Sequence, residues 1–151
     1  MTAFYHVCFV VPDIEQAMQD FQRSAGVEWS DPACDRLGEW DYRIAFTAGG
    51  PPFIELIQGP PRSPWDASKG ARFDHIGFWT SDLRQGSRRL EEAGMPMDFS
   101  GCPYGRPFAY HQVDSIGARI ELVDVSRQAG FLSRWHPGEN PMAAIDETSR
   151  S

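Results

Sequence analysis

The chain has 151 residues, of which 41% are hydrophobic and 23% are charged, a composition typical of a water-soluble globular protein with one compact core. Its 21 acidic residues outnumber its 14 basic ones, and the net charge of −7 argues against nucleic acid or an anionic membrane as a partner. No apolar run approaches the roughly 20 residues that span a bilayer, and no signal peptide is visible, so a cytoplasmic protein is expected.

The first predicted element is a strand over residues 3–11, which are rich in β-branched and aromatic side chains. Period two puts His6, Cys8 and Val10 on one face of this strand. Asp13 is then a favourable helix N-cap, and apolar residues recur at helical spacing until Gly26 ends the run. The pattern predicts a strand followed by an amphipathic helix.

A hairpin follows, because residues 40–48 alternate between apolar and polar, a Gly-Gly-Pro-Pro turn comes next, and residues 53–57 return as a strand. Residues 59–71 hold three prolines, two glycines and Trp65, and this composition predicts a connector. We expect Trp65 to be exposed and the connector to be able to act as a lid or as an arm to a partner subunit.

The second half of the chain repeats this order of elements. A strand over residues 72–80 carries His75 and Trp79 on one face, and Asp82 caps a helix that Gly94 ends. A weak strand is predicted over residues 95–100 and a turn-rich loop over 101–107. Two strands follow, over 108–114 and 118–125, joined by a turn. Residues 130–135 could pack as an aromatic anchor, and residues 136–151 are predicted to be a mostly disordered polar tail.

Two copies of one short pattern organise the chain, FYHVCFVVPDI at the start and FDHIGFWTSDL in the middle. Both the histidines and the helix-capping aspartates are displaced by 69 positions (75 − 6 and 82 − 13). Such internal similarity indicates a duplicated unit. We therefore expect one domain over residues 1–126, with modules at about 3–58 and about 72–126 and a polar tail over 127–151.

Each module closes in a similar strand, IELI around Glu55 and IELV around Glu121. A single histidine in a strand is commonly a core residue, and a single glutamate commonly faces water. An ionised carboxylate among apolar neighbours is costly unless it is paired or bound to a metal, however, and here the placement occurs twice. If the modules pair around an axis, two histidines and two glutamates form a site suited to Fe, Mn, Co, Ni or Zn.

With these motifs the chain resembles the vicinal oxygen chelate superfamily, which includes glyoxalases, epimerases, extradiol dioxygenases and bleomycin-resistance proteins. The resemblance covers about residues 3–125 and implies an α+β fold of two tandem βαβββ modules that form a half-open barrel around a metal site. The residues that match the superfamily's ligand positions for one divalent metal ion are His6, Glu55, His75 and Glu121.

The resemblance also implies the chemistry. Isomerases, epimerases and lyases of this superfamily move a proton beside a metal-chelated carbonyl, so Glu55 or Glu121 is the candidate catalytic base. Candidate substrate-binding residues lie on the strands that carry the proposed ligands, on the predicted strand over residues 108–114, or in the loop before that strand. They are Phe53, Trp79, Arg106, Tyr110, His111 and Arg119. Since Tyr110 and His111 are adjacent in a strand, at most one of them faces the inside of the half-open barrel.

Two other functions stay open. One is a small-molecule or antibiotic-binding protein of the bleomycin-resistance type, although such proteins usually lack the ligand set. The other is an Fe(II) ring-cleaving dioxygenase, although those enzymes usually carry two further modules. No basic cluster marks a glutathione or CoA site. The resemblance makes a homodimer the expected assembly.

The three cysteines, Cys8, Cys34 and Cys102, are odd in number and include no C-x-x-C pair. This favours reduced thiols over a disulfide framework or a zinc knuckle. Cys8 lies in an apolar run and is expected to pack as a small buried hydrophobe.

Overall fold

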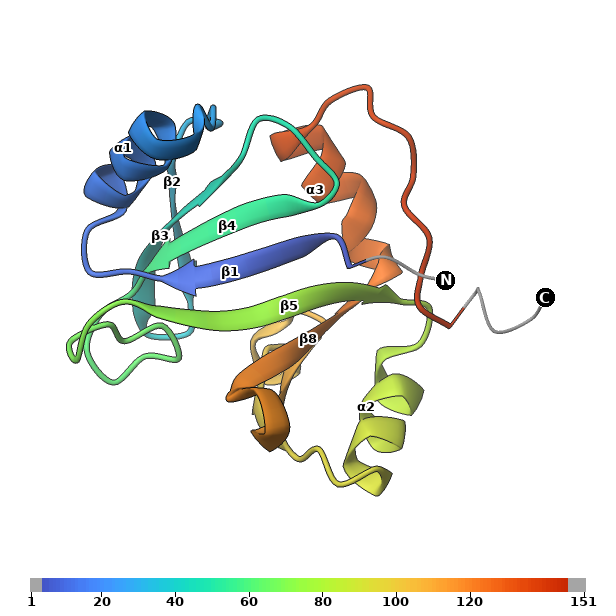
Figure 1. The fold of residues 1–151 in the computed structure, drawn as a ribbon. Helices are drawn as coiled ribbons and strands as arrows, with labels where there is room; N and C mark the ends of the chain where they lie inside the picture. The colour runs from blue at the N-terminus through green and yellow to red at the C-terminus, as the bar shows by residue number, and fades with distance from the viewer. Residues whose placement is uncertain (1–3, 147–151) are drawn as a thin grey trace. The chain divides into compact units, whose positions relative to one another are not determined.

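Two modules of strand, helix and three strands follow one another in the computed structural model, which describes residues 4–146 (Figure 1). The first comprises β1 (His6–Val10), α1 (Ile14–Ala25), β2 (Ala33–Leu37), β3 (Trp40–Phe46) and β4 (Phe53–Gln58). The second comprises β5 (Arg72–Thr80), α2 (Leu83–Glu92), β6 (Met97–Ser100), β7 (Phe108–Val113) and β8 (Ala118–Asp124). The duplication predicted from the repeated histidine pattern is therefore present in the order of the elements.

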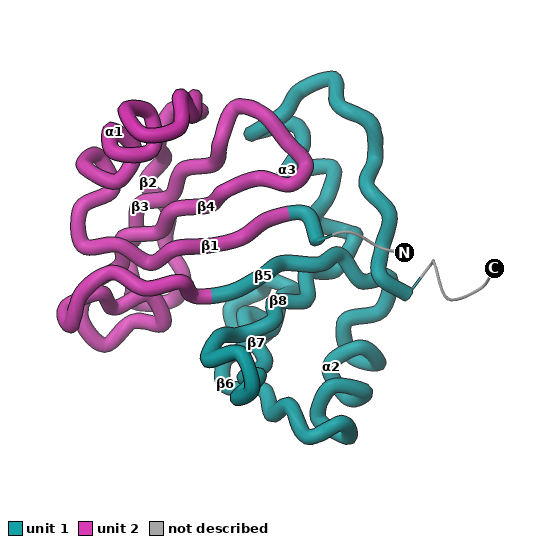
Figure 2. Tube along the Cα trace, viewed as in Figure 1, with its two compact units in different colours: residues 1–5, 75–151 teal, residues 6–74 magenta. Residues whose placement is uncertain are grey.

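The chain forms two compact units, residues 6–74 and residues 75–146 together with Phe4 and Tyr5 (Figure 2). Both helices begin as predicted. Asp13 accepts a hydrogen bond from the Gln16 backbone N–H at 3.0 Å, and Asp82 accepts one from Gln85 at 3.0 Å. Each bond satisfies one of the backbone donors left open at a helix start.

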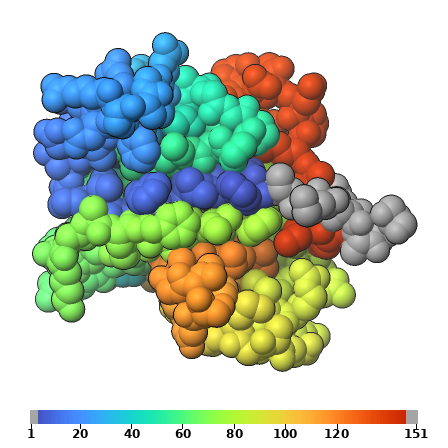
Figure 3. All heavy atoms as spheres, in the orientation of Figure 1, coloured from blue at the N-terminus to red at the C-terminus, as the bar shows by residue number. Residues whose placement is uncertain are grey.

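In the first unit the strand order is β2-β3-β4-β1, with β1 parallel to β4. The face of these strands that packs against α1 forms an apolar core of Val11, Ile14, Ala45 and Leu56. The atoms of β1 and β4 lie side by side in dark blue and turquoise in Figure 3, as their pairing requires. Since strand side chains alternate, the opposite face carries His6, Cys8 and Glu55.

In the second unit the strand order is β5-β8-β7-β6, with β5 parallel to β8. Leu83, Ala109 and Leu122 form the apolar core beneath α2. Gly86 lets this helix approach closely, because an added Cβ would lie 3.2 Å from both the Leu122 Cδ1 atom and the Thr80 hydroxyl oxygen. The first and second units thus use the same layering, a helix on one face of a four-strand segment.

Strand β2 was not predicted from the residues, because ACDRL lacks a continuous apolar alternation. Its formation depends on β3, with which it pairs antiparallel from Ala33↔Ile44 to Leu37↔Trp40. Gly38 has a φ of 59° in the tight turn between them. Glycine adopts this left-handed conformation at low cost.

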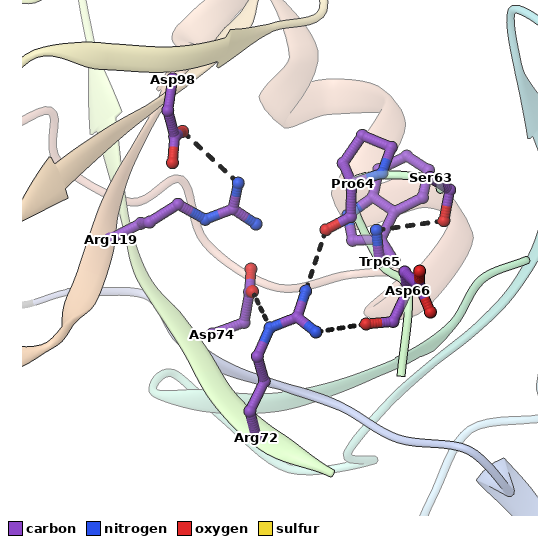
Figure 4. A network of polar contacts seen from close by, with 8 residues as sticks. All are labelled: Ser63, Pro64, Trp65, Asp66, Arg72, Asp74, Asp98 and Arg119. Carbon is purple, nitrogen blue, oxygen red and sulfur yellow. Dashed lines mark hydrogen bonds and ion pairs between the residues drawn. The ribbon is translucent and has the colours of Figure 1, made fainter. Parts of the chain in front are cut away.

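The expected exposure of Trp65 in the connector is wrong, because its side chain is only 2% exposed and its ring lies tilted against Tyr42 with ring centroids 4.5 Å apart. The connector is tied back to its own unit by the Arg72 guanidinium, as Figure 4 shows. That group donates to the Pro64 carbonyl at 3.0 Å, to the Asp66 carbonyl, and to the Asp74 carboxylate at 3.0 Å. Trp65 is therefore part of its own unit's core and does not serve as the exposed contact of an exchanged arm.

The prediction of a mostly disordered tail is also wrong as far as Asp146. Helix α3 (Gln128–Trp135) is followed by a segment that returns to the second unit. The Gln128 side chain exchanges two hydrogen bonds with the Met142 backbone, at 2.8 and 2.9 Å, and the Ile145 N–H donates to the Trp79 carbonyl at 2.8 Å. These polar groups bond to the protein's own backbone instead of remaining solvated.

The predicted aromatic anchor is confirmed, since Phe131 packs edge-on against Tyr5 and Trp79 at centroid distances of 5.4 and 5.8 Å. Residues 147–151 of the predicted tail and residue 3 of the first predicted strand lie outside the described residues. Between residues 4 and 146 no helix is long and apolar enough to cross a membrane. Cys8 is buried, and the three cysteines are free thiols.

Candidate metal centre

His6 and Glu55 form a buried pair on the strand face opposite α1. The His6 Nε2 atom lies 3.5 Å from the Glu55 Oε1 atom, and their side chains are 1% and 8% exposed. The pairing register of β1 and β4 explains why His6 and Glu55 lie close together. Because β1 and β4 run parallel with His6 opposite Phe53 and Cys8 opposite Glu55, the histidine and glutamate lie diagonally on one face.

His75 and Glu121 form the equivalent pair in the second unit. The separation of Nε2 from Oε1 is again 3.5 Å, and the side chains are 0% and 10% exposed. The register is also the same, with His75 opposite Arg119 and Gly77 opposite Glu121. The duplication read from the sequence is therefore preserved at the level of strand register and ligand spacing.

The chemistry of each pair fits a divalent metal. Imidazole nitrogen and carboxylate oxygen are ligands that Fe, Mn, Co, Ni and Zn accept. Two such atoms at about 2.0–2.2 Å from a tetrahedral ion lie about 3.3–3.6 Å apart, which matches the 3.5 Å seen in both pairs. The separation is longer than an ordinary hydrogen bond between these groups. Each unit thus supplies two side-chain atoms with a spacing that suits metal ligands.

The surroundings of the first pair are apolar. Phe46 lies edge-on to the His6 imidazole with centroids 5.9 Å apart, and Phe53 packs edge-on against Phe46 at 6.5 Å. Phe53 is 1% exposed and Cys8 is fully buried. Phe53, predicted as a substrate contact, therefore forms part of the wall beside His6.

The surroundings of the second pair are polar and aromatic. The Tyr110 ring lies 4.7 Å from the His75 ring, and the Arg119 guanidinium lies 4.0 Å above Tyr110. Arg119 also approaches the Asp98 carboxylate at 3.4 Å (Figure 4). Tyr110 pairs with Glu121 in the second unit, and Phe46 pairs with Glu55 in the first. Phe46 and Tyr110 therefore occupy equivalent positions in the two modules. Phe46 was missed by the sequence reasoning, although the repeat and strand alternation pointed to it.

The adjacent candidates Tyr110 and His111 face opposite sides of β7, as their alternation requires. Tyr110 shares the face of His75, whereas His111 lies beneath α2 with hydrogen bonds to Ser87 and to the Met95 carbonyl. Of these two predicted contacts, only Tyr110 lies beside a proposed metal ligand.

The last two predicted contacts have structural neighbours of their own. Trp79 is 2% exposed and lies between Tyr5, stacked at 4.2 Å, and Phe131 at 5.8 Å. Arg106 is half-buried in the loop after β6, where its backbone N–H donates to the Gly101 carbonyl at 3.0 Å. Trp79 therefore serves the packing of the second unit.

A model of the Glyoxalase/Bleomycin resistance protein/Dioxygenase superfamily matches residues 5–110 of the chain. The chain belongs to this superfamily. The predicted resemblance and the α+β fold of two βαβββ modules are confirmed. The half-open barrel around a metal remains a prediction from the resemblance.

Solved structures of similar fold include several epimerases. Methylmalonyl-CoA epimerase from Mycobacterium tuberculosis is 21% identical, with a TM-score of 0.57 over 80% of this chain and 86% of that chain. A Streptomyces coelicolor methylmalonyl-CoA epimerase variant in complex with 2-nitronate-propionyl-CoA is 19% identical, with a TM-score of 0.61 over 82% and 94%.

A variant of 4-hydroxymandelate synthase from Streptomyces coelicolor is 13% identical, with a TM-score of 0.57 over 80% of this chain and 47% of that chain. No curated protein matches the sequence. At these identities the likeness is one of fold, and within this superfamily one fold carries several activities.

Proposed function

We propose that this superfamily member is a divalent-metal-dependent isomerase, epimerase or lyase that transfers a proton beside the chelated carbonyl of a small molecule. The observation that carries the proposal is the repeated pair of buried histidine and glutamate, with the same 3.5 Å separation in both modules. A buried carboxylate is costly unless it is paired or bound to a metal, and this placement occurs in both modules.

His6, Glu55, His75 and Glu121 together would hold one ion. A bound divalent ion would stabilise the negative charge that develops on the substrate oxygen as a proton leaves the neighbouring carbon. Glu55 or Glu121 would take that proton, because a carboxylate at the site is within reach of a substrate held there. Both glutamates are buried, so their carboxylates are shielded from bulk water.

Residues beside the second pair would orient the substrate. The Arg119 guanidinium, held over the Tyr110 ring at 4.0 Å, is a cation that can attract an anionic substrate group. Phe46 and Phe53 supply the apolar wall of the first module. Because epimerases of similar fold act on methylmalonyl-CoA by name, acyl-CoA esters come first among the substrates to test, followed by 2-oxo acids and sugar ketones.

Metal analysis is the first test. The metal-free protein is reconstituted separately with Mn, Fe, Co, Ni and Zn, dialysed and analysed by elemental mass spectrometry. We expect one bound ion per chain, lost in His6→Ala and His75→Ala and retained in His136→Gln, a histidine outside the proposed ligand set. Failure of all five metals to bind at the four residues would reject the proposal.

Proton exchange is the second test. The metal-loaded protein is incubated in deuterium oxide with each substrate class, and loss of the proton next to the carbonyl is followed by NMR. Exchange that requires both the metal and the glutamates supports the proposed reaction. If the protein binds metal but exchanges the proton of none of these substrates, the proposed proton-transfer reaction is contradicted.

One observation favours a second function, the binding and sequestration of a flat molecule. Aromatic rings gather on β6, β7 and the loop between them, with Phe99 lying 6.2, 6.1 and 6.0 Å from Tyr104, Phe108 and Tyr110. Tight binding of a planar antibiotic by His75→Ala, with no turnover by the parent protein, would favour this function. Oxygen uptake with Fe(II) and a catechol would instead indicate the dioxygenase.

A further inference from the structure

A serine and a histidine meet beneath α2, on the face of β7 opposite Tyr110. The Ser87 hydroxyl oxygen lies 2.6 Å from the His111 Nε2 atom. The other ring nitrogen of His111, Nδ1, lies 2.8 Å from the Met95 carbonyl oxygen. The His111 side chain is fully buried, whereas Ser87 is half-buried. None of these atoms belongs to the proposed metal centre.

The Met95 carbonyl determines where the proton of the neutral imidazole resides. A carbonyl oxygen only accepts hydrogen bonds, so Nδ1 must carry the proton and donate it. Nε2 then has a lone pair and accepts the hydrogen bond from the Ser87 hydroxyl. A nucleophile within hydrogen-bond reach of a base, with the base oriented by a third group, is the arrangement that activates a serine.

Close packing of the helix brings these groups together. Because Gly86 has no side chain, α2 approaches β8 and the next residue, Ser87, can reach the buried histidine. The Ser87 oxygen also lies 3.8 Å from the Met97 sulfur, and Met97 is 43% exposed. An apolar, solvent-facing side chain thus borders the hydroxyl. The atoms of this part of the chain lie at the surface in yellow-green and yellow in Figure 3.

We propose that Ser87 is a nucleophile activated by His111 and that it accepts acyl groups from small activated esters with a short apolar acyl chain. The Ser87 oxygen attacks the ester carbonyl carbon while its proton passes to His111 Nε2. The ester C–O bond breaks, the leaving alcohol takes that proton, and an acyl-Ser87 ester remains. A water molecule then gives a proton to the same nitrogen as its oxygen bonds to the acyl carbon. The bond from the acyl carbon to the Ser87 oxygen breaks, the Ser87 oxygen takes that proton, and the acid is released.

Ser24 on α1 is a matched control within the same chain. It is a helix serine whose hydroxyl donates to the Asp20 carbonyl at 2.7 Å. A carbonyl cannot take the proton, so Ser24 has no base and should not react. The two serines therefore separate activation by His111 from the general reactivity of helical hydroxyls.

The test treats the full chain, in the presence of EDTA, with diisopropyl fluorophosphate, whose phosphorus forms a stable bond to an activated serine oxygen as fluoride leaves. Peptide mass spectrometry locates the adduct. We expect it on Ser87 and not on Ser24, and we expect Ser87→Ala to abolish it. His111→Gln should slow labelling about 100-fold or more. A matching release of 4-nitrophenolate from 4-nitrophenyl acetate should require Ser87.

An unlabelled Ser87, in a reagent batch that labels a known serine hydrolase, would overturn the proposal and leave the pair as a contact that holds α2 on the sheet. Equal labelling of Ser24 and Ser87 would overturn it as well. Because the decisive comparison is made within the unaltered chain, it holds even if His111→Gln fails to fold. The presence of EDTA makes the result independent of the proposed metal-dependent function.

Discussion

Glu55 and Glu121 occupy equivalent strand positions, but their neighbours differ in polarity. Phe46 stands opposite Glu55, whereas Tyr110, with the Arg119 guanidinium above it, stands opposite Glu121. The two modules therefore share the His–Glu spacing but differ in the side chains beside the pair. The side chain opposite Glu55 is apolar, whereas the one opposite Glu121 is a tyrosine that lies under a cation.

Glutamine variants test which carboxylate is the base. Glutamine keeps an oxygen ligand but cannot take a proton at neutral pH. We expect Glu55→Gln or Glu121→Gln to lower proton exchange by about 10²–10⁴-fold while the bound metal is retained. Exchange rates by NMR and metal content by mass spectrometry are measured on the same samples. Unchanged exchange in both variants would show that neither glutamate is the base.

Asp66 provides a prediction for stability against pH. Hydrogen bonds from the Arg62 backbone N–H and from Ser68 lower the pKa of its carboxyl to about 2. Because the folded pKa lies below the reference value of 3.8, the ionised form stabilises the fold above about pH 4, and this contribution is lost as the pH falls toward 2. Asp66→Asn should be less stable than the parent at pH 6, and the difference should shrink between pH 4 and 2 in urea titrations.

At the scale of the elements, helices α1 and α2 both begin with an aspartate N-cap. Asp13 and Asp82 precede α1 and α2 and accept the equivalent backbone hydrogen bond at 3.0 Å. Their 69-residue displacement in the sequence (82 − 13) therefore reflects the same local function in both modules. Beyond the first turn the helices differ, since Gly86 provides the close approach of α2 to the sheet.

The caps can be tested separately. Asp13→Ala and Asp82→Ala should each lower the free energy of unfolding by about 1 kcal/mol, because one backbone donor at the helix start loses its acceptor. Asparagine keeps an acceptor oxygen, so Asp13→Asn and Asp82→Asn should cost much less. Urea unfolding followed by circular dichroism measures the differences. Equal losses for alanine and asparagine would indicate that charge, and not capping, is responsible.

The segment after α3 acts as a structural element although it has little regular secondary structure. The Asp146 carboxylate accepts hydrogen bonds from the Ser81 backbone N–H at 2.9 Å and from the Thr80 hydroxyl at 3.3 Å. Burial opposes ionisation, but these hydrogen bonds hold the pKa of Asp146 below its usual value. The segment thereby closes on the end of β5 that leads into α2.

Removing this carboxylate should destabilise the second unit. We expect Asp146→Ala to lower the free energy of unfolding by about 1–3 kcal/mol, because donors at Ser81 lose a charged acceptor. Glu139→Ala, an exposed position in the same segment, is the control and should have little effect. Thermal unfolding at neutral pH provides the comparison. Equal stability of the two variants would mean that the closing contact contributes little.

For the whole molecule, the proposed metal centre predicts one bound metal ion per chain. If both His–Glu pairs bind one ion, either His6→Ala or His75→Ala removes the same ion and the double variant loses nothing more. If each pair binds its own ion, the protein holds two, and each single variant keeps one. Metal content and isothermal titration distinguish these outcomes, and two independent ions would contradict the shared centre.

The assembly state is a separate prediction at this scale. The family resemblance favours a homodimer, and sedimentation velocity of the purified chain measures it directly. Trp65 is buried against Tyr42, so a dimer would have to use a surface other than a free Trp65. A monomer at micromolar concentration would require all four proposed ligands to come from one chain, whereas a dimer would also allow them to come from two.

Local patterns in the sequence were enough for the repeat, both capped helices, most of the strands and the two His–Glu pairs. Helix caps and strand alternation depend on residues a few positions apart. The histidines are displaced by 69 positions (75 − 6) and the glutamates by 66 (121 − 55), so Glu55 and Glu121 were matched through their similar IELI and IELV strands.

Tertiary structure decided the features that depend on distant partners. β2 forms because β3 pairs with it, and Trp65 is buried because Tyr42 packs on it. The polar segment up to Asp146 is ordered because Ile145 donates to the Trp79 carbonyl and Asp146 accepts from Ser81. The contact of Ser87 with His111 joins residues 24 positions apart across a helix and a sheet. Composition and periodicity contain no information on such pairings, since each depends on which chemically suitable partner the fold brings near.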